Sequence, residues 1–209
     1  MKEIIRKELL ESAEVNRLLA EGQVEIILAM ARVLIRTIKS GGKVLFCGNG
    51  GSAADAQHLA AELVGRFQKE RKALPALALT ADASILTAIG NDYGFQEIFL
   101  RQIEALLNEG DALVALSTSG NSPNVAAAVA AAKAKGASTI GFTGRDGGLL
   151  GRLAGHSLLV PAAKTARIQE AHLVVGHILC GLIEEALSDQ EPAGRQKKAG
   201  DSNGLRSAK

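Results

Sequence analysis

Four polar side chains have the types and the spacing needed for proton transfer or metal binding. His58 and Glu62 lie four residues apart in an alanine-rich helical segment, so we expect them on one helix face. Gln169 and His177 lie eight residues apart in a second, strongly apolar helical segment, again along one stripe. Together they offer two imidazoles, one carboxylate and one amide oxygen, a donor set that suits Zn²⁺.

Ordinary structural roles are the alternative for the same four residues. Glu62 could form a surface ion pair with Arg66, four residues later, and His58 could be a core or polar-face histidine. Gln169 and His177 could be a polar stripe on an otherwise apolar helix. Because a polar group that is buried without a partner costs free energy, polar residues in so apolar a helix need partners, which favours a functional role.

Three glycine- and hydroxyl-rich loops each follow a short apolar run that is typical of a buried strand. They span residues 48–52, 117–122 and 143–148. In an open parallel sheet, ligands bind beyond the carboxyl ends of the strands, and backbone N–H groups at a helix N-terminus hold anions. The loop at 117–122 has more hydroxyl groups than a helix cap needs, so it is the best candidate for a phosphate ester. For any one loop, a tight turn with an ordinary serine cap is the alternative.

The helices after the first two loops are expected to begin at serine caps. Ser52 would cap the first helix, with Asp55 three residues later, and Ser122 would cap the second, with Pro123 at its first position. The first loop lacks the lysine of a P-loop and the third glycine of a dinucleotide-binding loop, which disfavours nucleotide binding.

Short apolar runs alternate with helical segments from Lys43 onward. The predicted strands are 43–47, 75–80, 111–116, 138–142 and 157–160. The predicted helices are 52–66, 83–89, 94–107, 122–135, 147–153 and 166–187. Strands separated by helices indicate βαβ units, hence a three-layer α/β fold around a parallel sheet. Residues 1–40 add an N-terminal helical arm, which a Gly-Gly pair ends.

Composition narrows the class of protein. The chain has 209 residues, 47% of them hydrophobic, which suits a single domain over residues 1–187 with a good core. Residues 188–209 are polar and are expected to be a disordered tail. A net charge of +2 and 3% aromatic residues argue against a nucleic-acid surface. Cys47 and Cys180 are expected to be buried free thiols, and no segment resembles a signal peptide or a membrane span, so we expect a cytoplasmic protein with no membrane partner.

The helix at 166–187 and the N-terminal arm carry more apolar surface than one sheet face can cover. Few polar residues interrupt the helix between Ile168 and Ile183. A helix that is apolar on most sides is covered on most sides. We therefore expect a homo-oligomer in which these two segments contribute to the subunit interface.

Four longer stretches of sequence carry a family resemblance. They are CGNGGSAADAQHLAAE at 47–62, GNDYGF at 90–95, LSTSGNS at 116–122 and RIQEAH at 167–172. With these motifs the chain resembles the sugar isomerase (SIS) domain family and, within it, the phosphoheptose isomerases. The resemblance covers residues 1–187 and implies a flavodoxin-like, five-stranded parallel sheet with helices on both faces, assembled as a homotetramer. The tail after Leu187 departs from the family pattern but touches no motif.

The resemblance also implies a role for each candidate residue. Glu62 and His177 would be the catalytic pair, with Glu62 as the base and His177 as the partner acid or base. One Zn²⁺ per subunit would be held by His58, Glu62, Gln169 and His177. The sugar phosphate would be bound by Asn49, Gly50, Gly51, Ser52, Glu62, Asn91, Asp92, Ser117, Thr118, Ser119, Ser122 and Gln169. A carboxylate that is committed to zinc is a poorer base, so the sequence leaves the role of Glu62 divided between the two.

The reaction that the resemblance implies is an aldose–ketose isomerisation. D-sedoheptulose 7-phosphate would become D-glycero-D-manno-heptose 7-phosphate through an enediol, toward the heptose of lipopolysaccharide core or another surface glycan. Such a reaction moves a proton between neighbouring carbons, so it needs a base for that proton and an acid for the oxygens. Zn²⁺ would act as a Lewis acid on the carbonyl.

Two other functions fit the same framework. Some relatives in the family bind the bacterial replication initiator protein and are regulatory rather than catalytic. A sugar-phosphate-sensing domain without catalysis is the third interpretation. The regulatory relatives lose the glutamate and the histidine at the positions of Glu62 and His177. This chain keeps both, together with the hydroxyl groups at 117–119, which favours the enzyme.

Overall fold

A five-stranded parallel sheet forms the centre of the computed structural model, which describes residues 1–188. The strand order is β2-β1-β3-β4-β5, and every neighbouring pair runs parallel. The strands are β1 (Val44–Gly48), β2 (Ala76–Ala78), β3 (Ala112–Leu116), β4 (Ser138–Gly144) and β5 (His156–Val160). All residues of β1 and β3 are buried, as expected for inner strands of a sheet that is covered on both faces. Each predicted strand is present.

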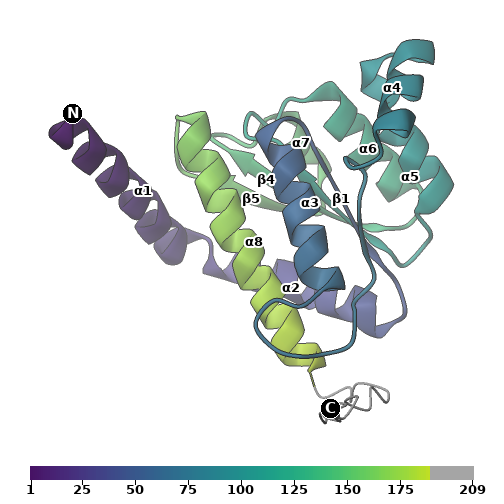
Figure 1. Ribbon diagram of the computed structural model, residues 1–209, viewed down its shortest axis with the longest axis horizontal. Helices are drawn as coiled ribbons and strands as arrows, with labels where there is room; N and C mark the ends of the chain where they lie inside the picture. The colour runs from purple at the N-terminus through teal and green to yellow at the C-terminus, as the bar shows by residue number, and fades with distance from the viewer. Residues whose placement is uncertain (189–209) are drawn as a thin grey trace, which may run out of the picture.

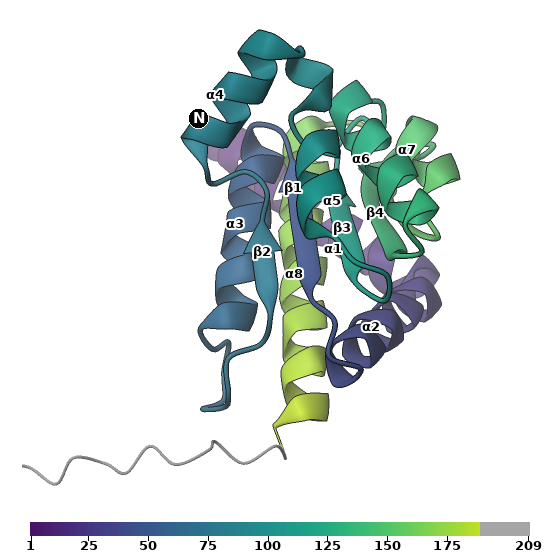
Figure 2. The same ribbon diagram turned by 90° about the vertical axis from the view of Figure 1, so that its right-hand side faces the viewer.

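Helices cover both faces of the sheet (Figures 1 and 2). They are α1 (Lys2–Gly22), α2 (Val24–Lys39), α3 (Gly51–Val64), α4 (Ala83–Asp92), the 3₁₀ helix η1 (Phe95–Glu97), α5 (Leu100–Leu106), α6 (Pro123–Ala134), α7 (Gly148–Leu153) and α8 (Thr165–Leu187). Val44 and Phe46 of β1 pack with α2, α3 and α8 on one face. Leu45 and Cys47 pack with α5, α6 and α7 on the other. The architecture is the three-layer, flavodoxin-like fold that the sequence predicts.

The segment predicted as an N-terminal arm forms two helices that meet at Gln23. α2 packs into the core, with Met30 and Leu34 buried. α1 extends away from the body of the molecule (Figure 1), and Ile5 and Leu9 near its start are more than half exposed. Only the C-terminal half of α1 therefore shares the core of its own chain.

The starts of α3 and α6 test the two predicted serine caps. The cap at Ser52 is wrong, because the chain already turns at Gly50, whose φ of +57° suits glycine. Ser52 instead lies buried in the first turn of α3. Ser122 precedes α6, with Pro123 in its first turn, as predicted. The predicted helix at 94–107 is divided into η1 and α5.

Cys47 and Cys180 are buried free thiols, as predicted, and burial raises the pKa of each to about 12. Within residues 1–188, no helix combines the length and the apolar character needed to cross a membrane. The predicted disordered tail lies, apart from Ser188, outside the described residues.

Candidate active site

Helices α3 and α8 lie side by side on one face of the sheet and run in the same direction (Figure 1). Their contacts follow the order of both sequences. Asp55 contacts Gln169, His58 contacts His177, and the loop after α3 contacts Glu184. The members of these pairs are 114 to 119 positions apart in the chain. Parallel packing therefore aligns the polar stripe of one helix with that of the other.

His58, Glu62 and His177 form one polar cluster between these helices. His58 Nε2 lies 2.8 Å from His177 Nε2 and 3.4 Å from a carboxylate oxygen of Glu62. One ligand atom from each of the three residues lies within 4.8 Å of the other two. Glu62 and His177 are half-buried, and His58 is exposed. Two imidazoles and a carboxylate at this spacing are a donor set that fits a metal ion, and the same groups can exchange protons.

The alternative surface roles for these residues do not account for the cluster. Arg66 lies 3.7 Å from Glu70 in an exposed pair, while the Glu62 carboxylate faces His58. His177 also contacts the ring of Phe67, with ring centroids 5.5 Å apart. Of the four residues that the sequence left open between structure and function, His58, Glu62 and His177 therefore lie together.

The side chain of Gln169 lies at the N-terminal end of α3. Its Nε2 donates to Asp55 Oδ1 at 3.3 Å. The amide also lies so close to Gly51 that a Cβ there would be 2.4 Å from it, so a larger residue would force the Gln169 side chain to move. The structure thus directs Gln169 toward Asp55 and the loop after β1, two turns of α8 before His177. The other oxygen of Asp55 is buried and has no hydrogen-bond partner among residues 1–188, and burial raises the pKa of this carboxyl.

The loops after β1 and β3 meet at the carboxyl edge of the sheet, because these strands are neighbours. Asn49 in the first loop and Asn124 beyond the second exchange amide hydrogen bonds of 2.8 and 2.9 Å. The Oγ of Ser117 lies 2.9 Å from that of Ser122 and 3.4 Å from that of Ser119. Three hydroxyl groups therefore gather at the start of α6, where free backbone N–H groups add donors for an anion. Thr118, in the same loop, is half-buried.

A small pocket opens at this edge of the sheet. It is lined by Asn49, Phe95, Gln96, Ser122, Pro123 and Asn124. The pocket joins the loop after β1, the start of α6 and η1. Both predicted binding loops therefore reach a common surface.

The third predicted loop, at 143–148, supports the second one. A Cβ at Gly120 would lie 2.1 Å from the carbonyl oxygen of Gly147. Directly after this loop, Leu150 N donates to Gly120 O at 2.8 Å, and Leu149 N donates to Asn121 Oδ1 at 3.0 Å. The loop at 143–148 and the start of α7 therefore hold the hydroxyl-rich loop at 117–122 in its conformation.

Asn91 and Asp92 lie at the end of α4, a helix without a buried residue. Asn91 Nδ2 donates to Asp92 Oδ1 at 2.7 Å, and both side chains are exposed. The described residues show no hydrogen bond from either side chain to the loops after β1 and β3. Within residues 1–188, these two predicted substrate residues are therefore not hydrogen-bonded to the other predicted binding residues of those loops.

Three residues that were not selected from the sequence also contact the site. Asp55 contacts Gln169, Asn124 holds Asn49, and Phe67 stacks on His177. Asp55 had a usable signal, since it lies three residues before His58 and thus on the same helix face. Asn124 and Phe67 gave none, because their partners are distant in the sequence.

Comparisons with known proteins identify the family of this chain. The SIS domain family model matches residues 11–144. The phosphoheptose isomerase of Aquifex aeolicus is 52% identical over 190 residues, which are 91% of this chain and 100% of that protein. A solved phosphoheptose isomerase from Neisseria gonorrhoeae has a TM-score of 0.83 and 44% identity, covering 88% of this chain and 98% of that one. A second, from Francisella tularensis, has a TM-score of 0.84 and 38% identity, covering 88% and 97%.

These matches extend over most of this chain and nearly all of each relative. The residues that the resemblance singled out lie within the matched length, and three of them form the cluster between α3 and α8. The chain belongs to the SIS domain family and, within it, to the phosphoheptose isomerases.

Proposed function

We propose that this chain converts D-sedoheptulose 7-phosphate into D-glycero-D-manno-heptose 7-phosphate through an enediol intermediate. The observation that carries the proposal is the cluster of His58, Glu62 and His177, within hydrogen-bond or near-contact distance of one another. A regulatory relative that binds a replication initiator protein needs no such cluster. Membership of the phosphoheptose isomerases supports the same choice.

Glu62 and His177 divide the proton chemistry in this proposal. Glu62 removes the proton from the carbon beside the carbonyl and returns it to the neighbouring carbon. His177 exchanges protons with the sugar oxygens as the enediol forms and collapses. The half-buried position of both residues supports these roles, because partial exclusion of water strengthens their interactions with the reacting atoms.

A zinc ion held by His58, Glu62, Gln169 and His177 completes the proposed site. When bound, zinc would polarise the carbonyl and stabilise negative charge on the enediol oxygens. Three of the four side chains already face one another, whereas the amide of Gln169 faces Asp55. Zinc content, measured by elemental analysis after purification without chelators, should be one ion per chain. It should fall strongly in His58→Ala, and full occupancy of that variant would remove His58 from the ligand set.

The two loops after β1 and β3 bind the sugar phosphate. The hydroxyl groups of the second loop and the N–H groups at the start of α6 hold the phosphate, and no lysine is needed. The sugar lies between that loop and the cluster. The complete proposed set is Asn49, Gly50, Gly51, Ser52, Glu62, Asn91, Asp92, Ser117, Thr118, Ser119, Ser122 and Gln169.

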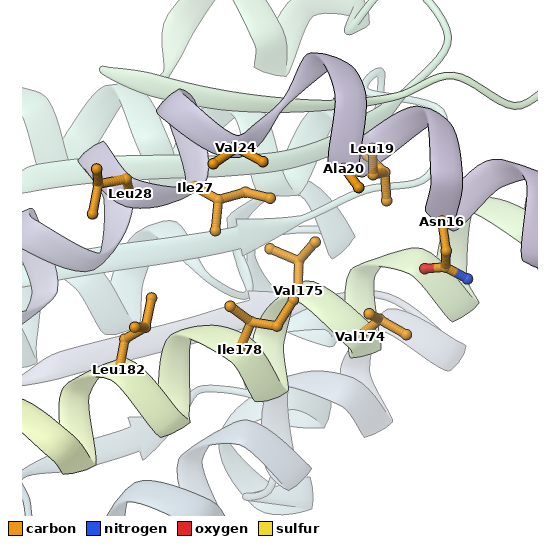
Figure 3. Close-up of a pocket in the computed structure, with 10 residues that line it drawn as sticks. All are labelled: Asn16, Leu19, Ala20, Val24, Ile27, Leu28, Val174, Val175, Ile178 and Leu182. Carbon is orange, nitrogen blue, oxygen red and sulfur yellow. The ribbon is translucent and has the colours of Figure 1, made fainter.

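A homotetramer is the proposed assembly. Figure 3 shows an almost wholly apolar groove between the first two helices and α8. Val174, Ile178 and Leu182 line it and are each more than a third exposed. The exposed apolar residues at the start of α1 offer a matching surface on a second copy. Light scattering should give four chains per particle, and a monomer at micromolar concentration would contradict the proposal.

The proposed setting is the cytoplasm, where the product supplies heptose for lipopolysaccharide core or another surface glycan. The two buried free thiols agree with a reducing compartment. An outer-surface location of the protein in fractionated cells would contradict this part of the proposal.

An isomerase assay tests the function directly. The purified chain, supplied with zinc, should form the aldose from D-sedoheptulose 7-phosphate, followed by NMR of the sugar. Absence of turnover together with measurable binding to an initiator protein would favour the regulatory alternative. Binding of the sugar phosphate without turnover would favour a sensor.

A further inference from the structure

The loop between α3 and β2 places an aromatic ring on the candidate catalytic histidine. The Phe67 ring stacks on the His177 imidazole with ring centroids 5.5 Å apart and 21° between the planes. His58 approaches the same imidazole edge-on, at 5.0 Å and 73°. The imidazole of His177 therefore has an apolar face on one side and the polar cluster at its Nε2.

A buried carboxylate on α8 holds this loop in place. Glu184 accepts hydrogen bonds from the backbone N–H groups of Phe67, Gln68 and Lys69, at 3.0, 2.7 and 2.8 Å. Its side chain is only 2% exposed. Three successive N–H groups bound to one carboxylate fix the backbone that carries the Phe67 ring.

Arg71 joins the same carboxylate to the end of α3. Its Nε donates to Glu184 at 3.0 Å, and the side chain of Arg71 is 1% exposed. Its two terminal nitrogens donate to the carbonyl oxygens of Glu62 and Leu63, at 2.8 and 3.0 Å. One buried ion pair is thus bonded both to the backbone of the proposed base and to the loop that covers His177.

The surface of α8 leaves room for the ring. His177, Gly181 and Glu184 follow one another at spacings of four and three residues, which places them on one helix stripe. A Cβ at Gly181 would meet the Phe67 ring at 3.6 Å, an ordinary contact distance. The ring therefore lies along the stripe between the catalytic histidine and the carboxylate that holds its loop.

We propose that Phe67 is a positioning residue for His177, and that the Arg71–Glu184 pair maintains it in that role. The torsion that turns an imidazole about its stem is broad, so packing must select one ring orientation. A flat ring stacked on the imidazole selects the orientation in which Nε2 faces His58 and Glu62. This inference rests on the function proposed above, in which His177 exchanges protons with the substrate.

Four variants of the full chain separate stacking from simple filling of space. Phe67→Tyr keeps a flat ring, Phe67→Leu keeps bulk without a flat face, and Phe67→Ala removes both. Lys72→Ala changes an exposed side chain of the same loop and is the matched control. We expect kcat within about twofold of the parent for Phe67→Tyr and Lys72→Ala. We expect about 10- to 100-fold lower kcat for Phe67→Leu and Phe67→Ala, with little change in KM, because misplacing a reacting group slows chemistry more than binding.

The imidazole proton signals of His177 give a readout that does not depend on turnover. In the parent and in Phe67→Tyr the stacked ring should shift them upfield, and in Phe67→Leu and Phe67→Ala they should move back. His177→Gln identifies the signals. A parent chain without turnover would refute the proposed function, and the NMR comparison would still test the stack. Equal kcat in Phe67→Leu and Phe67→Tyr, or signals that no Phe67 variant moves, would overturn the positioning role.

Discussion

The contact between α3 and α8 has a buried carboxylate near each end, and the two carboxylates differ in how many hydrogen bonds they accept. Toward the C-terminal ends, Glu184 accepts three backbone hydrogen bonds and one from Arg71. Toward the N-terminal ends, Asp55 accepts one 3.3 Å bond from the Gln169 side chain, and within the described part of the chain its second oxygen is buried without a partner. The Glu184 carboxylate therefore joins α8 to the loop after α3 with all its hydrogen bonds made, whereas the Asp55 carboxylate can accept further hydrogen bonds.

The pKa values of the two carboxyl groups follow the same difference. Burial opposes ionisation of Glu184, but the hydrogen bonds from the loop N–H groups and the charge of Arg71 outweigh it and lower its pKa. Burial raises the pKa of Asp55, and the bond from Gln169 offsets this only in part. Glu184, which serves the fold, is fully paired, whereas Asp55, beside the proposed ligand site, keeps one oxygen without a partner among residues 1–188.

The largest expected effect comes from the position between the two ends. Glu62→Gln keeps the size of the side chain but removes the proposed base, so turnover should fall at least about 10³-fold. The unfolding temperature should stay close to that of the parent, because Glu62 is bonded to Arg71 through its backbone carbonyl alone. The isomerase assay and a thermal melt check this, and an active Glu62→Gln enzyme would refute the assignment.

Breaking the buried Arg71–Glu184 ion pair should produce the largest loss of stability. Glu184→Gln leaves the Arg71 charge buried without its counter-charge, which should cost about 3 kcal/mol of unfolding free energy. For a chain of this size that lowers the unfolding temperature by roughly 6–12 °C. Glu185→Gln, at an exposed neighbouring position, is the matched control and should shift it little. Equal unfolding temperatures for the two variants would show that the Arg71–Glu184 pair does not stabilise the fold.

The stability that Glu184 contributes should depend on pH with a defined sign. Its pKa in the folded chain is lowered below the ordinary value of 4.5, so the folded state releases this proton more readily than the unfolded state does. The contribution is therefore complete above about pH 4.5 and is lost as the pH falls through the folded pKa. Urea unfolding of parent and Glu184→Gln should differ most at neutral pH and converge in acid. A constant difference would contradict the mechanism.

The smallest effect is expected at Asp55, where a substitution should raise the free energy of unfolding rather than lower it. Asp55→Asn keeps the shape but removes a charge whose second oxygen has no partner. The free energy of unfolding should rise by about 1 kcal/mol or less, because burying a charge costs more than burying the neutral amide that replaces it, although one polar atom still lacks a partner. A small upward shift in a thermal melt, beside the large downward shift of Glu184→Gln, would sharpen the contrast. A fall as large as that of Glu184→Gln would remove it.

Sequence patterns were sufficient where the signal is local. The apolar runs at 43–47 and 111–116 predicted strands, and the structure has β1 and β3 there, buried along their whole length, as a parallel strand covered on both faces requires. The spacing of His58 and Glu62 predicted one helix face, and the structure brings them to His177. Their residue types suggested grouping them with Gln169 and His177, and the resemblance implied the same four residues.

The parts that the sequence did not predict depend on contacts between distant segments. Ser52 looks like a helix cap, but Gly50, with its positive φ, takes the cap position, so α3 begins before Ser52. Gln169 shares a stripe with His177, yet the neighbouring helix presents Asp55 to it first. Nothing near Phe67 in the sequence indicates that it will lie on an imidazole from α8.

The common direction of α3 and α8 has an electrostatic consequence. The aligned peptide groups of a helix make its N-terminal end positive and its C-terminal end negative, by about half an elementary charge each. Two helices side by side with the same orientation add these fields, so the end that carries Gly51 and Gln169 has a positive field that favours an anion. At the opposite end, the guanidinium of Arg71 lies against the last carbonyl groups of α3 and compensates the negative pole. The paired helices therefore direct a positive field toward the proposed binding site of the sugar phosphate, and Arg71 offsets the negative field at the opposite end.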